Sequence, residues 1–308
     1  MKSKVNEHPV GSVKVTTFEV PPLGFDPRGA TKARLAHHGI APKPDKDKQP
    51  ELFEKWMNVY SKKLIHIVPE FVRNENKKHR PAANRSREKD GSQRSFNWTG
   101  VVARPPVGDR FKWITASWIV PNPSQPHGLA KGKRYYSSAW IGIDGWLPGD
   151  LLQAGTESDI LMQDNAAHRT VSHWWEWYPD GSVTINNHPV APGDYVACLI
   201  CSTGQTAMIY FANLSAHTHT SFQIRIPRGS TFKGNSADWV VEAPLINGAQ
   251  SELADYGATF FDGSYAGTQK EVRVDSGSGF TVKMMNGAKD VVSEGTIRGS
   301  DLLKAHYR

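Results

Sequence analysis

A carboxylate and an amide that interrupt apolar runs are the side chains of this sequence best placed to do chemistry. Glu242 lies within ADWVVEAP, and Gln153 lies within DLLQAG. A carboxylate in the middle of an apolar strand is costly to bury unless another group hydrogen-bonds it. Such a carboxylate can exchange a proton with water, as a general acid or base must. The pattern alone still favours a simpler interpretation, in which Glu242 lies on a solvated outer face.

Alternation along the tryptophan-rich segments separates a core face from a second, mixed face. In YYSSAWIGIDG, Trp140 and Asp144 project away from Ile141 and Ile143. The same reasoning applies to SHWWEWYPD and ADWVVEAP. Their mixed faces carry Ser172, Trp174, Glu176 and Tyr178 in the first, and Asp238, Val240 and Glu242 in the second.

The segments that must position these residues are short apolar or alternating runs. From about Phe96 onward, Gly, Pro, Asn and Asp separate these runs. Many strands at this spacing, with no convincing helix between them, predict an antiparallel all-β sandwich or barrel. The chain of 308 residues is long enough for one large domain with an appendage.

Residues 1–95 form a separate, basic region. They hold 20 Lys and Arg against 11 Asp and Glu, a net charge of +9, whereas residues 96–308 have a net charge of −2. Nine of the ten tryptophans lie in the acidic part. Because a nucleic-acid-binding domain more often combines its positive charge with aromatic side chains, we expect no nucleic-acid partner.

The basic region is predicted to be partly helical. Helices are expected over 31–39, between the caps Thr31 and Gly39, and over 50–68. The second helix has an apolar stripe that needs a partner surface. Residues 74–95 have almost no apolar side chains and are predicted to form a solvated, protease-accessible linker. We therefore expect two units, 1–95 and 96–308.

The ordered blocks W-x-G, AWIGIDG, LLQAG, WWEWYPD and ADWVVEAP, over roughly residues 96–262, resemble the glutamic peptidases, or eqolisins. Five ordered blocks are far more specific than a single motif. The stretch from GFDPRGATKARLAHHG to IVPEF is also similar to the leader region of bacterial-type members. The resemblance implies a lectin-like jelly roll, that is, a β-sandwich of two packed antiparallel sheets.

The resemblance also implies a catalytic dyad of Gln153 and Glu242. In that dyad Glu242 takes a proton from the water that attacks a peptide carbonyl, and the neutral Gln153 amide stabilises the oxyanion. Since a carboxylate with a pKa near about 4.3 is a base only where it ionises, we expect an acid-acting endopeptidase. Its partners would be polypeptide substrates, and no metal or organic cofactor is implied.

Six further residues are implied to line the substrate cleft: Trp98, Trp140, Asp144, Trp174, Glu176 and Tyr178. Plain packing is the other interpretation of each tryptophan. Ser172 departs from the family pattern, because some members carry an acidic residue there. The alternative function is a catalytically inactive, lectin-like module that binds carbohydrate or peptide through its tryptophans.

The remaining motifs are weaker. Asp275 in VDSGSG resembles the loop of pepsin-like aspartic peptidases, but no second copy is present, so a polar turn is expected. Cys198 and Cys201 are expected to be buried thiols. His217 and His219 are expected to form a polar strand edge rather than a metal site.

The location of the protein is not fixed by the sequence. No apolar run approaches the roughly 18 residues of a membrane span, so no membrane partner is expected. The N-terminus MKSKVNEHPVGSVKV lacks the apolar core of a signal peptide, although the family resemblance suggests secretion.

We expect residues 1–95 to be the pro-segment of a zymogen and to dock on the catalytic domain. The net charge of +9 and the apolar helix stripe complement a domain of net charge −2 with an aromatic cleft. Because domain carboxylates protonate as the pH falls, release of the segment in acid is predicted.

Overall fold

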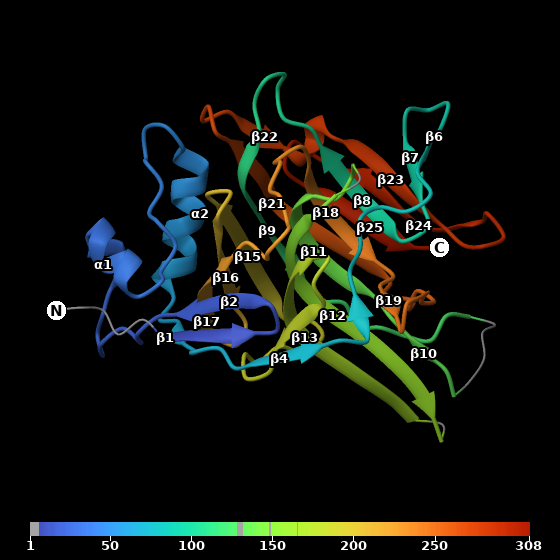
Figure 1. The fold of residues 1–308 in the computed structure, drawn as a ribbon, viewed down its shortest axis with the longest axis horizontal. Coiled ribbons are helices and arrows are strands. Elements are labelled where there is room, and N and C mark those ends of the chain that lie inside the picture. The colour runs from blue at the N-terminus through green and yellow to red at the C-terminus, as the bar shows by residue number, and fades with distance from the viewer. Residues whose placement is uncertain (1–5, 128–131, 148, 165) are drawn as a thin grey trace.

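Antiparallel β-sheets build most of this computed structural model, which describes residues 6–127, 132–147, 149–164 and 166–308 (Figure 1). Strands make up 49% of the structure and helices 8%, which confirms the predicted all-β class. Among the described residues, no helix is both long enough and apolar enough to cross a membrane.

The first sheet carries the sequence blocks that were singled out above. Its strands run in the order β4 (Phe71–Asn74), β14 (Ser182–Ile185), β13 (Ala166–Tyr178), β12 (Leu151–Gln163), β11 (Ser138–Asp144), β18 (Ala237–Glu242), β8 (Trp98–Ala103) and β23 (Phe280–Met285).

The second sheet packs against the first. Its order is β21 (Ala258–Thr268), β9 (Phe111–Ile119), β15 (Tyr195–Ser202), β16 (Thr206–Asn213) and β17 (Thr218–Arg225). Strands β24 (Val291–Ile297) and β25 (Leu303–Tyr307) continue the hydrogen bonding from β23 round to β21. Short pieces complete the domain: β10 (Arg134–Tyr135), β22 (Arg273–Asp275) and the 3-10 turn Ser276–Ser278.

The core lies between the sheets, where large apolar side chains from both meet. Trp175 of β13 lies 5.7 Å from Phe222 of β17, ring centre to ring centre. Ile141, Ile143 and Trp239 are fully buried in the same cluster. The predicted division of the strands into core and mixed faces is therefore confirmed, and the mixed face of the first sheet points away from this core.

The N-terminal region runs along one flank of the sandwich and is hydrogen-bonded to both sheets (Figure 1). The hairpin β1 (Asn6–Val10) and β2 (Val13–Thr17) extends the second sheet beside β17, and β3 (Ile65–His66) pairs in parallel with β17. A 3-10 turn (Pro27–Gly29) and the helices α1 (Lys32–His37) and α2 (Pro50–Ser61) lie between these strands.

The two predicted helices form, the second over a shorter span. Thr31 caps α1 by accepting a hydrogen bond from the backbone N–H of Arg34 at 3.3 Å. Helix α2 ends at Ser61 rather than at residue 68, because Ile65 and His66 enter β3. The apolar stripe of α2 buries Trp56 in a cluster that Leu199 and Tyr210 of the second sheet also join.

The predicted solvated linker is wrong for much of 74–95. Strand β5 (Lys77–Lys78) joins β19 (Leu245–Ile246) and β20 (Ala249–Gln250) in a small sheet. After β6 (Ser86–Arg87), β7 (Gln93–Ser95) pairs with β23. Lys77, His79, Ser92 and Ser95 are buried. A polar sequence is buried here because the sandwich supplies partners for its charges and backbone groups.

The weaker motifs take structural places. Asp275 ends β22 before a 3-10 turn, as predicted. Cys198 is buried and Cys201 is half-buried, and both are free thiols. The prediction of a polar strand edge is wrong for His219, which is buried in β17 between β16 and β3. His217 precedes β17 with a φ of 53°.

Candidate active site

Gln153 and Glu242 project from the mixed face of the first sheet, on strands that both neighbour β11. Gln153 lies opposite Gly142, and Glu242 lies opposite Ser138. Both side chains are fully buried. The interpretation that Glu242 lies on a solvated face is therefore wrong, because the N-terminal region covers this face.

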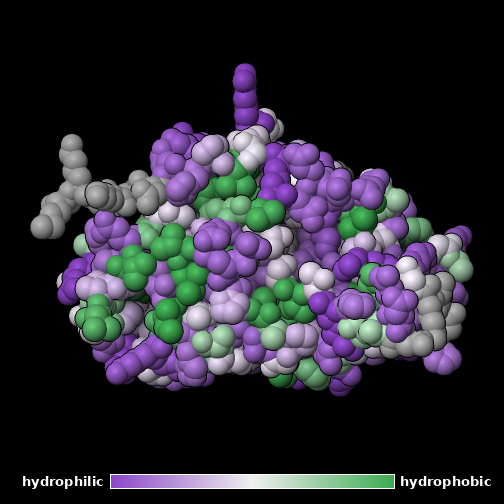
Figure 2. Space-filling view, turned by 90° about the horizontal axis from the view of Figure 1, so that it is seen from below, coloured by the Kyte–Doolittle hydropathy of each residue, from purple (hydrophilic) through white to green (hydrophobic). Residues whose placement is uncertain are grey.

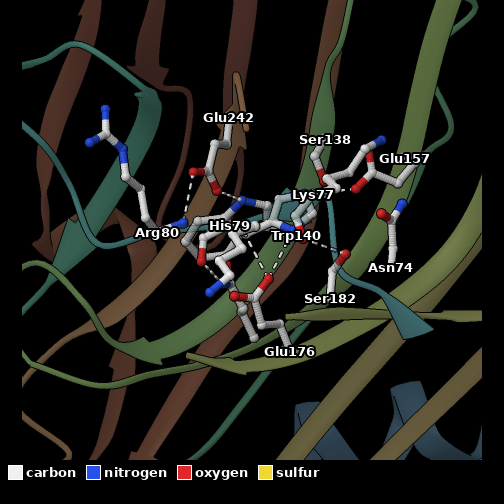
Figure 3. A network of polar contacts seen from close by, with 12 residues as sticks. Asn74, Lys77, His79, Arg80, Ser138, Trp140, Glu157, Glu176, Ser182 and Glu242 are labelled. Atoms are coloured by element: carbon white, nitrogen blue, oxygen red, sulfur yellow. Dashed lines mark hydrogen bonds and ion pairs between the residues drawn. The ribbon is translucent and has the colours of Figure 1, made fainter. Parts of the chain in front are cut away.

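The covering segment is residues 77–81, which begin with strand β5. Figure 3 shows its Lys77, His79 and Arg80 beside Glu176 and Glu242. Gln153 Nε2 donates to the carbonyl oxygen of His79 at 2.8 Å. The backbone N–H of Arg80 donates to Glu242 Oε1 at 3.1 Å. The two side chains thus contact the two ends of one peptide group, the one that joins His79 to Arg80.

Glu242 is held by two more N–H donors. Asn97 Nδ2 donates to Oε1 at 3.1 Å, and Trp140 Nε1 donates to Oε2 at 3.0 Å. Burial raises the pKa of Glu242 to about 8, although His79, Arg80 and Asn97 all act to lower it. At Gly155 a Cβ atom would lie 2.2 Å from the carbonyl oxygen of Ala139 and 2.5 Å from Trp140 Cβ. The glycine of the L-Q-x-G block therefore lets the backbone of β11 around Trp140 approach β12 closely.

His79 fills a pocket between Glu176 and the Trp174 ring. Its imidazole stacks on Trp174 with 3.5 Å between ring centres, and its backbone N–H donates to Glu176 Oε2 at 2.8 Å. Burial raises the pKa of Glu176 to about 7, against the lowering effect of His79. Burial disfavours the charged form of His79, but Glu157, Glu176 and Glu242 together outweigh it and raise the pKa of His79 to about 9.

An acidic pair on β12 receives the two basic side chains of the segment. Lys77 Nζ lies 2.9 Å from Glu157 Oε2 and 2.7 Å from Asp159 Oδ2, and His79 Nε2 lies 2.7 Å from Glu157 Oε1. Burial opposes ionisation of Glu157, but Lys77 and His79 outweigh it and lower its pKa to about 2. Burial raises the pKa of Asp159 to about 6.

The residues predicted to line a cleft divide into two groups. Trp98, Trp140, Trp174 and Glu176 contact either the segment or Glu242, and Trp98 Nε1 donates to the carbonyl of Arg80 at 3.0 Å.

Asp144 and Tyr178 have other surroundings. Asp144 is buried and accepts backbone N–H groups from Lys233, Gly234 and Asn235 at 2.7 to 3.0 Å, so it anchors that loop. Tyr178 lies opposite Leu151 and packs against the tryptophan cluster beside the site. Ser172 lies opposite Glu157 on the paired strands.

Sequence reasoning missed four residues at this site. Glu157 and Asp159 continue the alternation that starts at Gln153, so the period of two along LLQAGTESD was the signal that could have found them. Asn97 and His79 gave no such signal. Their roles come from tertiary contacts between 79–83 and the sheet.

No group of three or more His, Cys, Asp and Glu side chains within the described ranges has the geometry to hold a metal ion. The site consists of an amide, several carboxyl groups and a wall of indoles on one sheet. A carboxyl group in such a site can exchange a proton with water, and an amide N–H can stabilise a developing oxyanion.

A match to a protein-family model identifies the family of this chain. The model of the peptidase A4 family matches residues 96–307, and the chain belongs to this family. A curated relative, scytalidopepsin B from Scytalidium lignicola, is 28% identical over 112 residues, which cover 36% of this chain and 37% of the relative. That match spans well under two thirds of the relative's length.

Solved structures of glutamic peptidases share the fold. Scytalido-glutamic peptidase in complex with a transition state analog inhibitor has a TM-score of 0.58 at 20% identity, over 69% of this chain and 98% of that one. Aspergilloglutamic peptidase from Aspergillus niger has a TM-score of 0.51 at 22% identity, over 56% and 99%. The likeness confirms the predicted two-sheet sandwich.

Proposed function

We propose that this peptidase A4 chain is an acid-acting endopeptidase in which Glu242 and Gln153 form the catalytic dyad. One observation carries the proposal. The amide of Gln153 and the carboxyl group of Glu242 contact the carbonyl oxygen and the nitrogen of a single peptide group, at 2.8 and 3.1 Å.

Each side chain has a role that follows from its chemistry. Glu242 removes a proton from water as the water attacks the carbonyl carbon, and it then delivers a proton to the leaving nitrogen. Gln153 donates its N–H to the oxygen on which negative charge develops, and as a neutral group it does not repel Glu242. Its buried Oε1 atom has no partner among the described residues and offers an acceptor to the attacking water.

The acid preference depends on access of water to Glu242. With the segment in place, burial raises the pKa of Glu242 to about 8, so its carboxyl group is protonated in acid and is not a base. Departure of residues 77–81 opens Glu242 to bulk solvent and removes the cause of the raised pKa. We therefore expect cleavage of other chains in acid only after the cleft has opened.

Residues 1–95 are proposed to be a pro-segment that closes the cleft of the catalytic domain 96–308. Support comes from the segment 77–81 in contact with both dyad residues, and from the opposite net charges of the two parts. A peptide segment of the chain itself occupies the tryptophan-lined face, which favours a peptidase over a lectin-like carbohydrate-binding module.

Digestion of an unfolded protein substrate tests this function. The full chain is incubated with the substrate from about pH 2.5 to 7, beside the variants Glu242→Gln and Glu252→Gln. Glu252 is a half-exposed glutamate that pairs with Lys133, so it controls for the loss of one carboxylate. We expect acid-limited cleavage that Glu242→Gln abolishes and Glu252→Gln retains. No cleavage by the folded wild-type chain at any pH would contradict the proposal.

A further inference from the structure

The segment in the cleft is held as a peptide substrate would be, along its backbone. Strand β5 pairs with β19 on one side, and Ser182 Oγ donates to the carbonyl of Lys77 at 3.1 Å. On the far side of the dyad, the backbone N–H of Ala82 donates to the carbonyl of Gly145 at 3.1 Å. These contacts fix which peptide group meets the dyad.

The register places one bond in that position. The carbonyl oxygen of His79 faces the Gln153 amide, and the nitrogen of Arg80 faces the Glu242 carboxyl group. The peptide groups on either side are tied down as well. Glu176 accepts the backbone N–H of His79, and Asn97 Nδ2 donates to the carbonyl of Arg80 at 3.2 Å.

Buried side chains reinforce this register. Lys77 lies against Glu157 and Asp159, and the fully buried His79 is stacked on Trp174. Sliding the segment by one residue would turn each of these side chains to the opposite side of the strand and would leave charges buried without partners. Covering the cleft would not require that the His79 carbonyl contacts the Gln153 amide and that the Arg80 nitrogen contacts the Glu242 carboxyl group.

We propose that the peptide bond between His79 and Arg80 is the self-cleavage site of this chain. The proposal rests on the proposed function of the dyad. A water oxygen bonds to the carbonyl carbon of His79, and the bond to the Arg80 nitrogen breaks. Glu242 acts in its ionised form, whose fraction under the docked segment increases as the pH approaches about 8. It takes a proton from the water and passes a proton to that nitrogen. The products are a fragment 1–79 with a terminal carboxyl group and a chain that begins at Arg80.

The cut does not by itself release the fragment. Strands β2, β3 and β4 belong to residues 1–79, and they stay paired with β17 and β14. The cut chain is therefore expected to remain a complex of two pieces under native conditions. Because the bond already lies against the dyad of its own molecule, the cut is intramolecular, and its rate constant does not change with dilution.

Intact-mass measurement and N-terminal sequencing test the site. The wild-type full chain is held between about pH 3 and 8 at two concentrations tenfold apart, beside Glu242→Gln, Arg80→Pro and Arg80→Ala. Proline at position 80 removes the N–H that faces Glu242, whereas alanine keeps it. We expect a new N-terminus at residue 80 in the wild type and in Arg80→Ala. We expect at least about a 100-fold slower cut at this bond in Glu242→Gln and Arg80→Pro.

The outcomes separate this proposal from the proposed function. If the chain digests an added substrate but its 79–80 bond stays intact, or is cut only in other positions, the self-cleavage site is wrong and the peptidase function stands. If neither the added substrate nor the chain is cut, both are wrong. Circular dichroism and thermal unfolding of each variant establish that it is folded, so a missing cut reports on chemistry.

Discussion

Glu242 lies among N–H donors that work against the effect of its burial. Arg80, Asn97 and Trp140 each donate to its carboxyl group, and this pattern suits an ionised acceptor. Burial nevertheless raises its pKa to about 8 in the closed cleft. Arg80 and Asn97 both lower the pKa of this carboxyl group, and we propose that Asn97 is a positioning residue for it.

Replacing Asn97 should shift the pH dependence of cleavage. The hydrogen bond from Asn97 lowers the pKa of Glu242, so Asn97→Ala raises that pKa. The limb of the pH–rate profile that reports ionisation of the base should then move to higher pH. The pH profile of kcat/KM on a peptide substrate measures this shift. The control is Asn187→Ala, because Asn187 hydrogen-bonds the backbone of Glu70 and Val68 and not Glu242. An unchanged limb in Asn97→Ala would contradict this role.

Replacing Gln153 should slow catalysis even though the Glu242 carboxyl group is still present. Gln153→Glu keeps the shape of the side chain but exchanges its N–H donor for a second carboxyl group beside the developing oxyanion. Loss of one such donor typically slows the reaction by about 10² to 10³-fold. The matched control is Gln163→Glu, an exposed position at the end of the same strand. Cleavage rates that agree between the two variants would rule out the oxyanion role.

Alternation predicted much of this face but not all of it. The strand period assigned Trp140, Trp174 and Glu176 to the side away from the core, where they lie. Pattern alone left Glu242 on a solvated face, since local sequence does not reveal that residues 77–81 cover it. Asn97 was missed for the same reason, because its hydrogen bonds reach Arg80 and Ala83 across the fold.

At the scale of elements, the pairing of β3 with β17 brings His66 and His219 together, and His188 lies between these two and His173 of β13. His66 and His219 meet with 4.7 Å between ring centres, and His173 stacks on His188 at 4.5 Å. Burial lowers the pKa of all four, to about 4 for His66, about 3 for His173 and His219 and about 2 for His188. These side chains are therefore neutral in the folded protein down to strongly acid pH.

The histidine cluster should make the protein less stable in acid. Each folded-state pKa lies below the unfolded value of about 6.5, so the stabilisation is complete above that pH and is lost as the pH falls towards the folded values. For His66 the shift to about 4 corresponds to at most about 3 kcal/mol. His66→Phe keeps a ring against His219, and its free energy of unfolding should fall less between pH 6.5 and 4. Denaturant unfolding at both pH values measures the difference. An equal fall in both proteins would contradict it.

Tertiary contacts also explain where the observed elements differ from the predicted ones. Helix α2 stops at Ser61 although its apolar pattern continues, because the edge of β17 offers backbone partners to Ile65 and His66. The polar run 74–95 lacks the apolar residues that identify a strand. Its short strands form because β19 and β23 pair with them. Neither partner is visible from the local sequence.

At the scale of the molecule, the basic region and the acidic domain meet through paired strands, through the apolar cluster around Trp56 and through buried charges beside Gln153 and Glu242. On the face drawn in Figure 2, hydrophobic residues form separate patches that hydrophilic residues divide. Lys77 and His79 are buried against Glu157 and Asp159, and salt screens such buried pairs less than exposed ones. These contacts bind two basic side chains of residues 1–95 to two acidic side chains of the domain.

Docking of residues 77–81 should be strongest in mild acid. The lowered pKa of Glu157, about 2, stabilises the docked state above about pH 4.5, and this contribution is lost as the pH falls towards 2. The raised pKa of His79, about 9, stabilises it below about pH 6.5, and this contribution is lost as the pH rises through 9. The protection of the 77–80 amides from hydrogen exchange, relative to the unfolded chain at the same pH and in the uncut Glu242→Gln chain, should therefore be greatest between these limits.

A matched pair of variants locates this effect at the acidic pair. Lys77→Gln removes the ammonium group that pairs with Glu157 and Asp159. Lys78→Gln removes an ammonium group that lies 3.4 Å from the carbonyl oxygen of Pro179. Faster exchange is expected in Lys77→Gln alone. Equal exchange in the two variants would show that the acidic pair does not hold the segment.

A double-mutant cycle on cleavage rate tests the central claim most directly, that Gln153 and Glu242 act together on one peptide group. The rates of substrate cleavage are measured for the wild type, Gln153→Ala, Glu242→Gln and the double variant. Residues that act as a unit give strongly non-additive effects. The account predicts that the double variant is no slower than Glu242→Gln within error. A double variant slowed by the product of the two single effects, or an active Glu242→Gln, would contradict it.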